Sequence, residues 1–200
     1  MSGTGIGGNE IGGPKRFTAP QRVLHWLMAV CIVTMLFLGV GMVSTVAPKY
    51  LTLFQIHKTL GIAILVLAVI RLGLRLVNTA PGLPRDMPVP MRLAAELSQY
   101  VFYALMLGMP VLGWAALSSA SHPVVLFGGV HLPAILPVNP ETYALLRWAH
   151  VYLGFAFFAL ILMHVAALMF HKLVRKDGVF EAMAPVLTEN QEQELESKST

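Results

Sequence analysis

The stretch IHKTLGIAILVLAVIRLGLRL, residues 56–76, decides the fold of this chain. Between Lys58 and Arg71 it has no charged side chain, and the apolar segment around it covers residues 51–77. About 20 apolar residues are enough for a helix to cross a bilayer. Three other segments also meet this requirement, and they cover residues 23–46, 93–117 and 143–170.

The composition agrees with four membrane spans. Of the 200 residues, 56% are hydrophobic and 12% are charged, whereas a soluble domain has roughly 25% charged residues. Spans with so few polar groups must satisfy their backbones internally as helices. We therefore predict an all-α, integral membrane four-helix bundle over residues 18–178. A flexible N-terminal tail would cover residues 1–17 and a cytoplasmic C-terminal tail residues 179–200.

The positions of the basic residues predict the orientation. Eleven of the 14 fall on the side that also carries both termini, and the other side has only Lys49, Lys58 and Arg147. By the positive-inside rule, both termini face the cytoplasm. No basic cluster lies on a soluble module, so the expected partner is membrane lipid and not nucleic acid.

The histidines of the last segment have a spacing that indicates a cofactor. His150 and His164 are 14 residues apart, which is almost four full helical turns, so both face the same side and lie roughly 21 Å apart along the axis. An ionisable residue inside a membrane helix is by default a functional candidate. Two stacked haem groups, one near each face of the membrane, would need this arrangement. Because Cys31 is the single cysteine and there is no C-x-x-C-H, both would be non-covalent haem b.

Each haem iron needs a second axial ligand from another helix at the same depth. His57 lies near the start of the second segment, level with His150 on the outer side. His25 lies about two turns after an expected N-cap at Thr18, close to the depth of His164. We predict that His57 and His150 bind the outer iron and that His25 and His164 bind the inner one.

Two further residues are placed near the inner haem. Arg71 follows His57 by 14 residues on the same helical face, where it would meet the haem propionates; the alternative is a positive-inside residue at the interface. His171 lies seven residues after His164 and competes with it as a ligand. We prefer His164, because His171 would bring the haem to the headgroups, and we assign His171 as a propionate or quinone neighbour.

Glycines follow both outer ligands at the same offset. Gly61 comes four residues after His57, and Gly154 comes four residues after His150. A side chain there would collide with the porphyrin, and glycine removes it. The alternative is that both glycines pack helices together, as small residues do in membranes.

The chain also resembles a known family, the bacterial cytochrome b561 family of four-helix di-haem membrane proteins. The resemblance covers residues 16–185 and rests on QRVLHWL in the first segment, IHKTLGIAILVLAVIRLGLRL in the second, GMPVLGW in the third, and WAHVYLG with LMHVAALMFHK in the fourth. The family's axial ligands carry over onto His25, His57, His150 and His164. Family members often have a histidine near the start of the third helix, where this chain has Gln99.

The resemblance implies electron transfer between the two membrane faces, with ubiquinone as the acceptor. One close relative type oxidises superoxide on the periplasmic side, and Lys49, Lys58 and Arg147 would form an attractive rim for a small anion. A different interpretation is a haem b anchor subunit that receives electrons from a redox partner protein in a hydrogenase- or dehydrogenase-type complex. A third interpretation, a metal or proton transporter, is disfavoured because the spans have no carboxylate except Glu96 at an edge.

Overall fold

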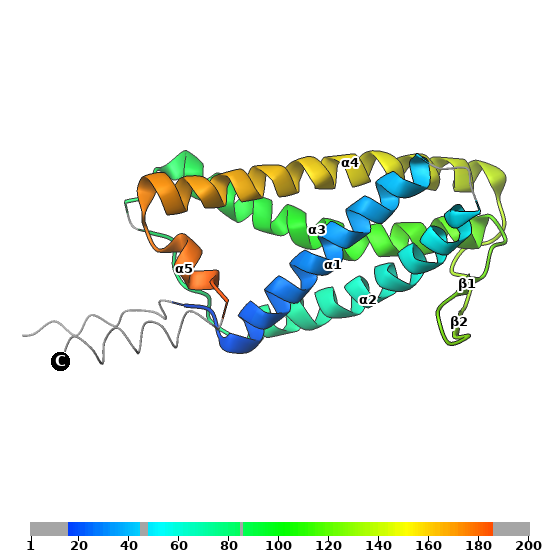
Figure 1. Ribbon diagram of the computed structural model, residues 1–200, viewed down its shortest axis with the longest axis horizontal. Coiled ribbons are helices and arrows are strands. Elements are labelled where there is room, and N and C mark those ends of the chain that lie inside the picture. Colours follow the sequence, from blue (N-terminus) through cyan, green and yellow to red (C-terminus); the bar gives the residue numbers. More distant parts are fainter. Residues whose placement is uncertain (1–15, 45–47, 85, 186–200) are drawn as a thin grey trace, which may run out of the picture.

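A computed structural model describes residues 16–44, 48–84 and 86–185, and it confirms the predicted all-α architecture with four helices long and apolar enough to cross a membrane. These helices are α1 (Ala19–Val43), α2 (Lys49–Val77), α3 (Val89–Ser119) and α4 (Pro140–Phe170) (Figure 1). The predicted end of the first span at residue 46 lies outside the described residues, as do most of both predicted tails.

The helices begin two to four residues before the apolar segments that predicted them. Proline occupies the first turn of α1, α3 and α4, where its missing N–H costs nothing. The expected N-cap of α1 is confirmed at Thr18, whose backbone N–H donates to Gln21 Oε1 at 3.1 Å. Asn139 caps α4 by accepting a hydrogen bond from the Thr142 N–H. These polar caps extend α1 and α4 beyond their apolar parts.

The helices run alternately up and down between two ends of the molecule. We call the end that carries the start of α1 and the last described residues the terminal end, and the opposite end the hairpin end (Figure 1). The α1–α2 and α3–α4 pairs pack most extensively, and α2 also packs against α3. As a result, His25 and His164 belong to the terminal end, whereas His57 and His150 belong to the hairpin end.

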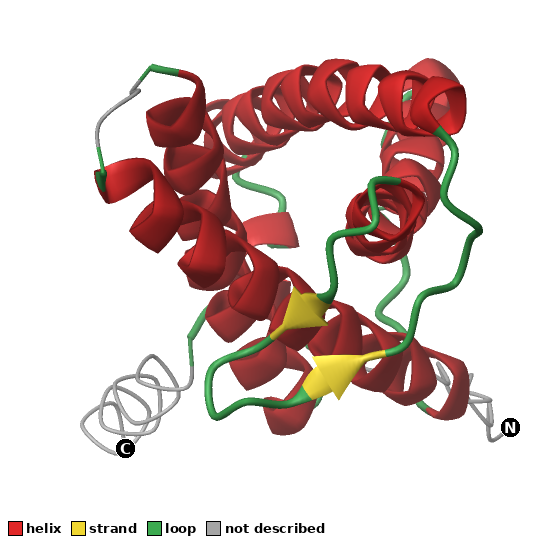
Figure 2. Cartoon of the chain, turned by 90° about the vertical axis from the view of Figure 1, so that its right-hand side faces the viewer, coloured by secondary structure: helices red, strands yellow, loops and turns green. Residues whose placement is uncertain are grey.

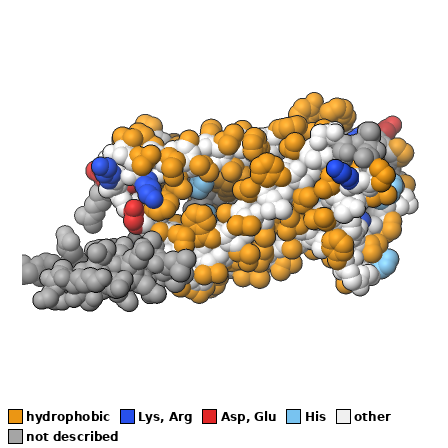
Figure 3. Space-filling model, in the orientation of Figure 1, with side chains coloured by type: hydrophobic (Ala, Val, Ile, Leu, Met, Phe, Trp, Pro, Cys, Tyr) orange, Lys and Arg blue, Asp and Glu red, His pale blue; other side chains and the backbone are white. Residues whose placement is uncertain are grey.

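The interior is small and apolar, and the surface between the two ends is apolar as well. The buried cluster takes residues from all four helices: Leu24, Met28, Ile32, Ile64, Ala68, Met106 and Phe157. Many large apolar side chains point outward, and Phe37, for example, has 74% of its surface exposed. Hydrophobic side chains cover most of the visible middle of the molecule, and the charged ones gather near its ends (Figure 3). This distribution suits a chain whose solvent is lipid.

A two-stranded hairpin between α3 and α4 gives the hairpin end its name, and the sequence did not predict it. Strands β1 (Val124–Val125) and β2 (His131–Leu132) pair antiparallel (Figure 2). Gly128 and Gly129 both have positive φ angles in the turn, which favours glycine. Gln55 of α2 donates to the Val125 carbonyl at 2.8 Å, so the hairpin is tied to the start of α2.

The chain turns back at the terminal end after α4. A π-helical turn, η1 (His171–Arg175), is followed by the short helix α5 (Val179–Met183). Trp26 of α1 donates its indole N–H to the Met183 carbonyl at 2.9 Å, and the Phe17 N–H donates to the Ala182 carbonyl at 3.0 Å. The segment after α4 is therefore docked on the start of α1, while the predicted domain boundary at residue 178 stays a prediction.

Candidate functional site

At the hairpin end, the structure brings the predicted outer ligands together. His57 projects from α2 and His150 from α4, and their ring centroids are 6.1 Å apart with an interplanar angle of 64°. His57 lies about two turns after the start of α2, and His150 lies about three turns after the start of α4. Two imidazoles from separate helices thus lie next to each other in the bundle.

The separation of these rings fits a shared metal ion. Two imidazoles on opposite sides of one metal ion put their ring centres about 6 Å apart, because a metal–imidazole bond is about 2 Å and each ring centre lies about 1 Å behind its nitrogen. The Nδ1 atoms of His57 and His150 are both buried and have no hydrogen-bond partner within the described residues. Buried polar atoms are normally satisfied, and a metal would take up one ring nitrogen of each histidine while the other donates a hydrogen bond.

The type of metal group follows from the number of ligands. Within residues 16–44, 48–84 and 86–185, no group of three or more His, Cys, Asp or Glu side chains is placed to hold a metal ion. A bare zinc ion takes four ligands, of which the protein supplies at least three. A haem iron takes its equatorial ligands from the porphyrin and needs only two axial ligands from the protein. Paired histidines therefore fit haem better than a bare ion.

At the terminal end, the predicted inner ligands also lie near each other. His25 of α1 and His164 of α4 lie within electrostatic range of one another, and Arg71 of α2 lies within range of both. The Nη1 atom of Arg71 is buried without a hydrogen-bond partner in the described part of the chain. A free guanidinium nitrogen beside two histidines suits an anionic group such as a haem propionate.

The glycines that follow the outer ligands face methionines from neighbouring helices. A Cβ atom at Gly61 would lie 3.7 Å from Met35 Cε, and one at Gly154 would lie 3.7 Å from Met109 Cε. Both distances are ordinary van der Waals contacts with the flexible end of a side chain. Tight packing between the helices of this chain therefore does not require glycine at either position.

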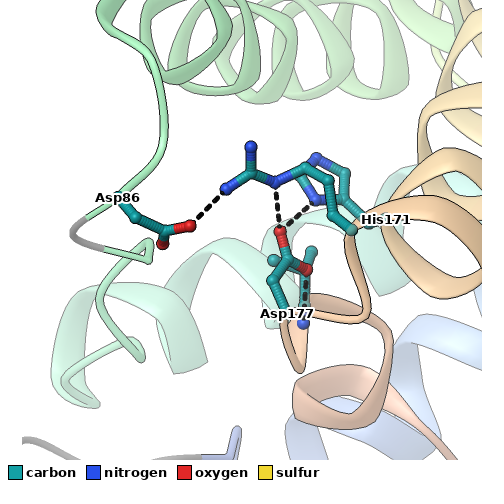
Figure 4. Close-up of polar contacts among 5 residues, drawn as sticks. Asp86, His171 and Asp177 are labelled. Atoms are coloured by element: carbon teal, nitrogen blue, oxygen red, sulfur yellow. Dashed lines mark hydrogen bonds and ion pairs between the residues drawn. The ribbon is translucent and has the colours of Figure 1, made fainter.

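His171 lies apart from the predicted ligand pairs, in a polar network. Its Nδ1 atom is 2.7 Å from Asp177 Oδ2, and the same oxygen accepts from Arg175 Nε at 2.8 Å (Figure 4). Arg175 also donates to Asp86 in the loop between α2 and α3. Burial alone would raise the pKa of Asp177, but hydrogen bonds from Arg175, His171 and the Val179 N–H lower it below its usual range. The network therefore joins His171 to the segment that follows α4 and, through Arg175, to the loop between α2 and α3.

Sequence reasoning missed two residues of α3 that touch predicted ligands. Gly113 packs its bare backbone against the ring of His150, and Phe102 places its ring 5.1 Å from that of His164. Gly113 lies in the GMPVLGW stretch, but nothing distinguishes it there from a packing glycine. Phe102 is one of many apolar residues in its helix. Neither residue type marks a site until the neighbouring helix is placed.

A membrane bundle whose helices carry histidines in cross-helix pairs defines a class, the membrane-embedded b-type cytochromes. Comparison with known proteins agrees, because residues 16–185 match the family described as prokaryotic cytochrome b561. The chain belongs to this family, and b-type haem is the cofactor that membership implies.

The alignments with three similar proteins cover almost the whole length of each relative. Cytochrome b561 homolog 2 of Escherichia coli (strain K12) is 28% identical over 173 residues, which are 85% of this chain and 92% of the relative. Cytochrome b561 homolog 1 of the same organism is 27% identical over 86% of this chain and 98% of its own. Probable superoxide oxidase CybB of Yersinia pestis is 27% identical over 86% and 97%, respectively.

Proposed function

We propose that this protein transfers electrons across a bacterial inner membrane through two non-covalent b haems. His57 and His150 would hold the haem at the hairpin end, and His25 and His164 the haem at the terminal end. The observation that carries the proposal is the 6.1 Å separation of the His57 and His150 rings. The second pair follows from the same face of α4, since His164 comes 14 residues after His150.

The orientation of the bundle in the membrane sets the direction of the proposed electron transfer. In this proposal the hairpin end faces the periplasm and the terminal end the cytoplasm, because most basic residues lie toward the terminal end. Haem b supplies reversible one-electron chemistry when it is bound. The protein's part is to hold the two sites at opposite depths and to keep water out of the apolar core between them.

We further propose superoxide as the electron donor and ubiquinone as the acceptor. The name of the Yersinia pestis relative, a probable superoxide oxidase, supports the donor. Each superoxide loses one electron and becomes dioxygen, and a quinone takes two electrons and two protons to become a quinol. Two superoxide anions are therefore consumed for each quinol formed.

The two ends carry groups suited to these partners. At the hairpin end, Lys58 lies over the Phe54 ring with its Nζ 5.0 Å from the centroid, directly after the predicted ligand His57. A fixed positive charge there would attract a small anion. At the terminal end, His171 is 8% exposed and lies 2.7 Å from Asp177, and in this proposal it would serve the quinone.

Stopped-flow reduction of the purified protein by superoxide tests the proposal, with and without ubiquinone. We expect superoxide to reduce the haems and ubiquinone to reoxidise them, both followed in the haem absorption bands. Superoxide dismutase should abolish the signal. Lys58→Gln should slow reduction and weaken its salt dependence. Lys172→Gln is the matched control, because Lys172 makes a similar contact with Phe180 at the terminal end.

The anchor-subunit alternative predicts a different result. Such a protein would stay oxidised in superoxide and would be reduced only by a soluble redox subunit that co-purifies with it. Equal effects of Lys58→Gln and Lys172→Gln would contradict the proposed donor site. A haem content other than two per chain in the pyridine haemochrome assay would contradict the di-haem assignment itself.

A further inference from the structure

We infer that α3, which supplies no predicted haem ligand, positions both of the ligands that α4 supplies. Gly113 would set the ring of the outer ligand His150, and Phe102 would set the ring of the inner ligand His164. This inference rests on the proposed di-haem function and assigns roles to residues within it. Both are positioning residues, since they act through the histidines and not on the iron.

The antiparallel packing of α3 and α4 brings the relevant faces together. Three contacts follow one another along the pair: Gly113 with His150, Met109 with Gly154, and Phe102 with both Phe157 and His164. Phe102 and Gly113 are 11 residues apart, which is about three full turns, so they share one face of α3. His150, Phe157 and His164 are spaced by sevens and share one face of α4.

Gly113 positions the outer ligand by leaving room for it. A Cβ atom at Gly113 would lie 3.2 Å from Cε1 and 3.5 Å from Nδ1 of His150. The first distance is tighter than nearly all real Cβ contacts, so the ring would have to move by a few tenths of an ångström. His57 lies on another helix with its ring centroid 6.1 Å away. A shift of His150 would therefore change the geometry of the whole outer pair.

Phe102 positions the inner ligand by an aromatic contact. Its ring meets that of His164 at an interplanar angle of 74° and a centroid distance of 5.1 Å, which is a favourable edge-to-face geometry. Phe102 is fixed in turn by Phe157, at 5.9 Å and 66°. Phe157 is the one buried residue of α4, with 6% of its surface exposed. The ring of His164 is thus held from the protein side while His25 and Arg71 lie near it.

Ring orientation matters because groups around a ligand tune the metal it binds. The plane of an axial imidazole affects the electron paramagnetic resonance of low-spin ferric haem, and ligand geometry affects the midpoint potential. Perturbing Gly113 should therefore alter the outer haem alone, and perturbing Phe102 should alter the inner haem alone. General loosening of the bundle would alter both haems together.

The experiment compares Gly113→Ala with Phe102→Leu in the full-length protein. The signals of the two haems are first assigned with His57→Ala and His164→Ala, which each leave one haem. We then expect two haems in each positioning variant, with shifted resonance and potential for the outer haem in Gly113→Ala and for the inner haem in Phe102→Leu. Phe102→Tyr keeps the ring and should restore the inner signal.

Matched controls come from the same helices. Gly108→Ala lies on α3, where an added Cβ meets nothing within 4 Å, and Phe155→Leu lies on α4 with 59% of the side chain exposed. Both should leave the two signals unchanged. If Phe102→Leu does not fold, Phe102→Met replaces it, because methionine also removes the aromatic ring and fills irregular space, and Gly113→Ala still tests the outer haem.

Two outcomes overturn the inference. One is an unchanged pair of signals in Gly113→Ala and Phe102→Leu, and the other is a change of both haems in either variant. A wild-type protein without two bis-histidine haems would instead overturn the proposed function. The two failures are therefore distinguishable.

Discussion

Replacing Gly61 separates two explanations for the glycine that follows His57 by one turn. If the glycine clears a path for the porphyrin, a side chain there should cost haem affinity while leaving the protein itself stable. If it packs helices, the cost should fall on the protein. In the structure an added Cβ would lie 3.7 Å from the end of Met35, so the chain alone has room for a methyl group.

The expected changes in the stability of the protein and in its affinity for haem have opposite signs. Alanine in place of a glycine inside a helix stabilises by roughly 0.5–1 kcal/mol, and the contact with Met35 does not oppose this gain. A branched side chain in a tight cofactor site costs roughly 1–3 kcal/mol, which is about one to two orders of magnitude in affinity. We expect Gly61→Val to lose the outer haem selectively, and Gly61→Ala to show a milder loss.

Two measurements are needed on each variant. Haem affinity is measured by transfer to an excess of a haem scavenger, and stability by unfolding of the haem-free protein in detergent. Gly154→Val is a replicate on α4, where Met109 is the neighbour, and Gly73→Val is the control on α2, where an added Cβ meets nothing within 4 Å. Retention of both haems with unchanged potentials in Gly61→Val and Gly154→Val would refute the reasoning and favour helix packing.

Three further predictions concern the histidine ligands, the network around Asp177 and the hairpin. Alanine at His57 or His150 should remove the outer haem, and alanine at His25 or His164 should remove the inner one, as measured by haem stoichiometry. His171→Ala should keep both haems, and loss of the inner haem in His171→Ala alone would reverse the assignment of His164. Because its hydrogen bonds lower the pKa of Asp177, their stabilisation is present above the pKa of the unfolded carboxyl and is lost as the pH falls through the folded value. Once the intrinsic pH dependence of exchange is divided out, the protection of the α5 amides against hydrogen exchange should therefore fall on acidification. Asp177→Asn, which weakens the contact with His171 by about 1 kcal/mol, should lower that protection at neutral pH, and equal protection in the variant and the wild type would contradict this. Gln55→Ala should speed exchange in β1 about fivefold, the equivalent of about 1 kcal/mol, and leave the core of α2 unchanged; faster exchange throughout α2 would show that the hairpin supports the whole helix.

The sequence predicted the fold because a lipid environment requires a simple pattern of long apolar segments. A bilayer demands about 20 apolar residues for each crossing, and this length alone located all four helices to within a few residues of their observed starts. The approach of His57 to His150 was likewise predictable, since both the depth of a residue and its helical face follow from residue counts.

The remaining features depend on neighbours that residue counts do not supply. The network around His171 joins Arg175 to Asp86, which are 89 residues apart, and no local pattern connects them. The hairpin strands have two residues each, too few for a period to be visible. Gly113 and Phe102 carry no polar atom in their side chains, so their contacts with histidines appear only when α3 and α4 are packed together.

The positions of the predicted ligands suggest why the haems would matter for assembly as well as for electron transfer. The helices of this chain pack most extensively as two pairs, α1 with α2 and α3 with α4. His57 of α2 meets His150 of α4, and His25 of α1 approaches His164 of α4, so each ligand pair joins one helix pair to the other. Lipid provides no hydrophobic drive for this association. A group bound by both histidines of a pair would therefore hold the two halves together, since binding that requires the folded site adds its free energy to folding.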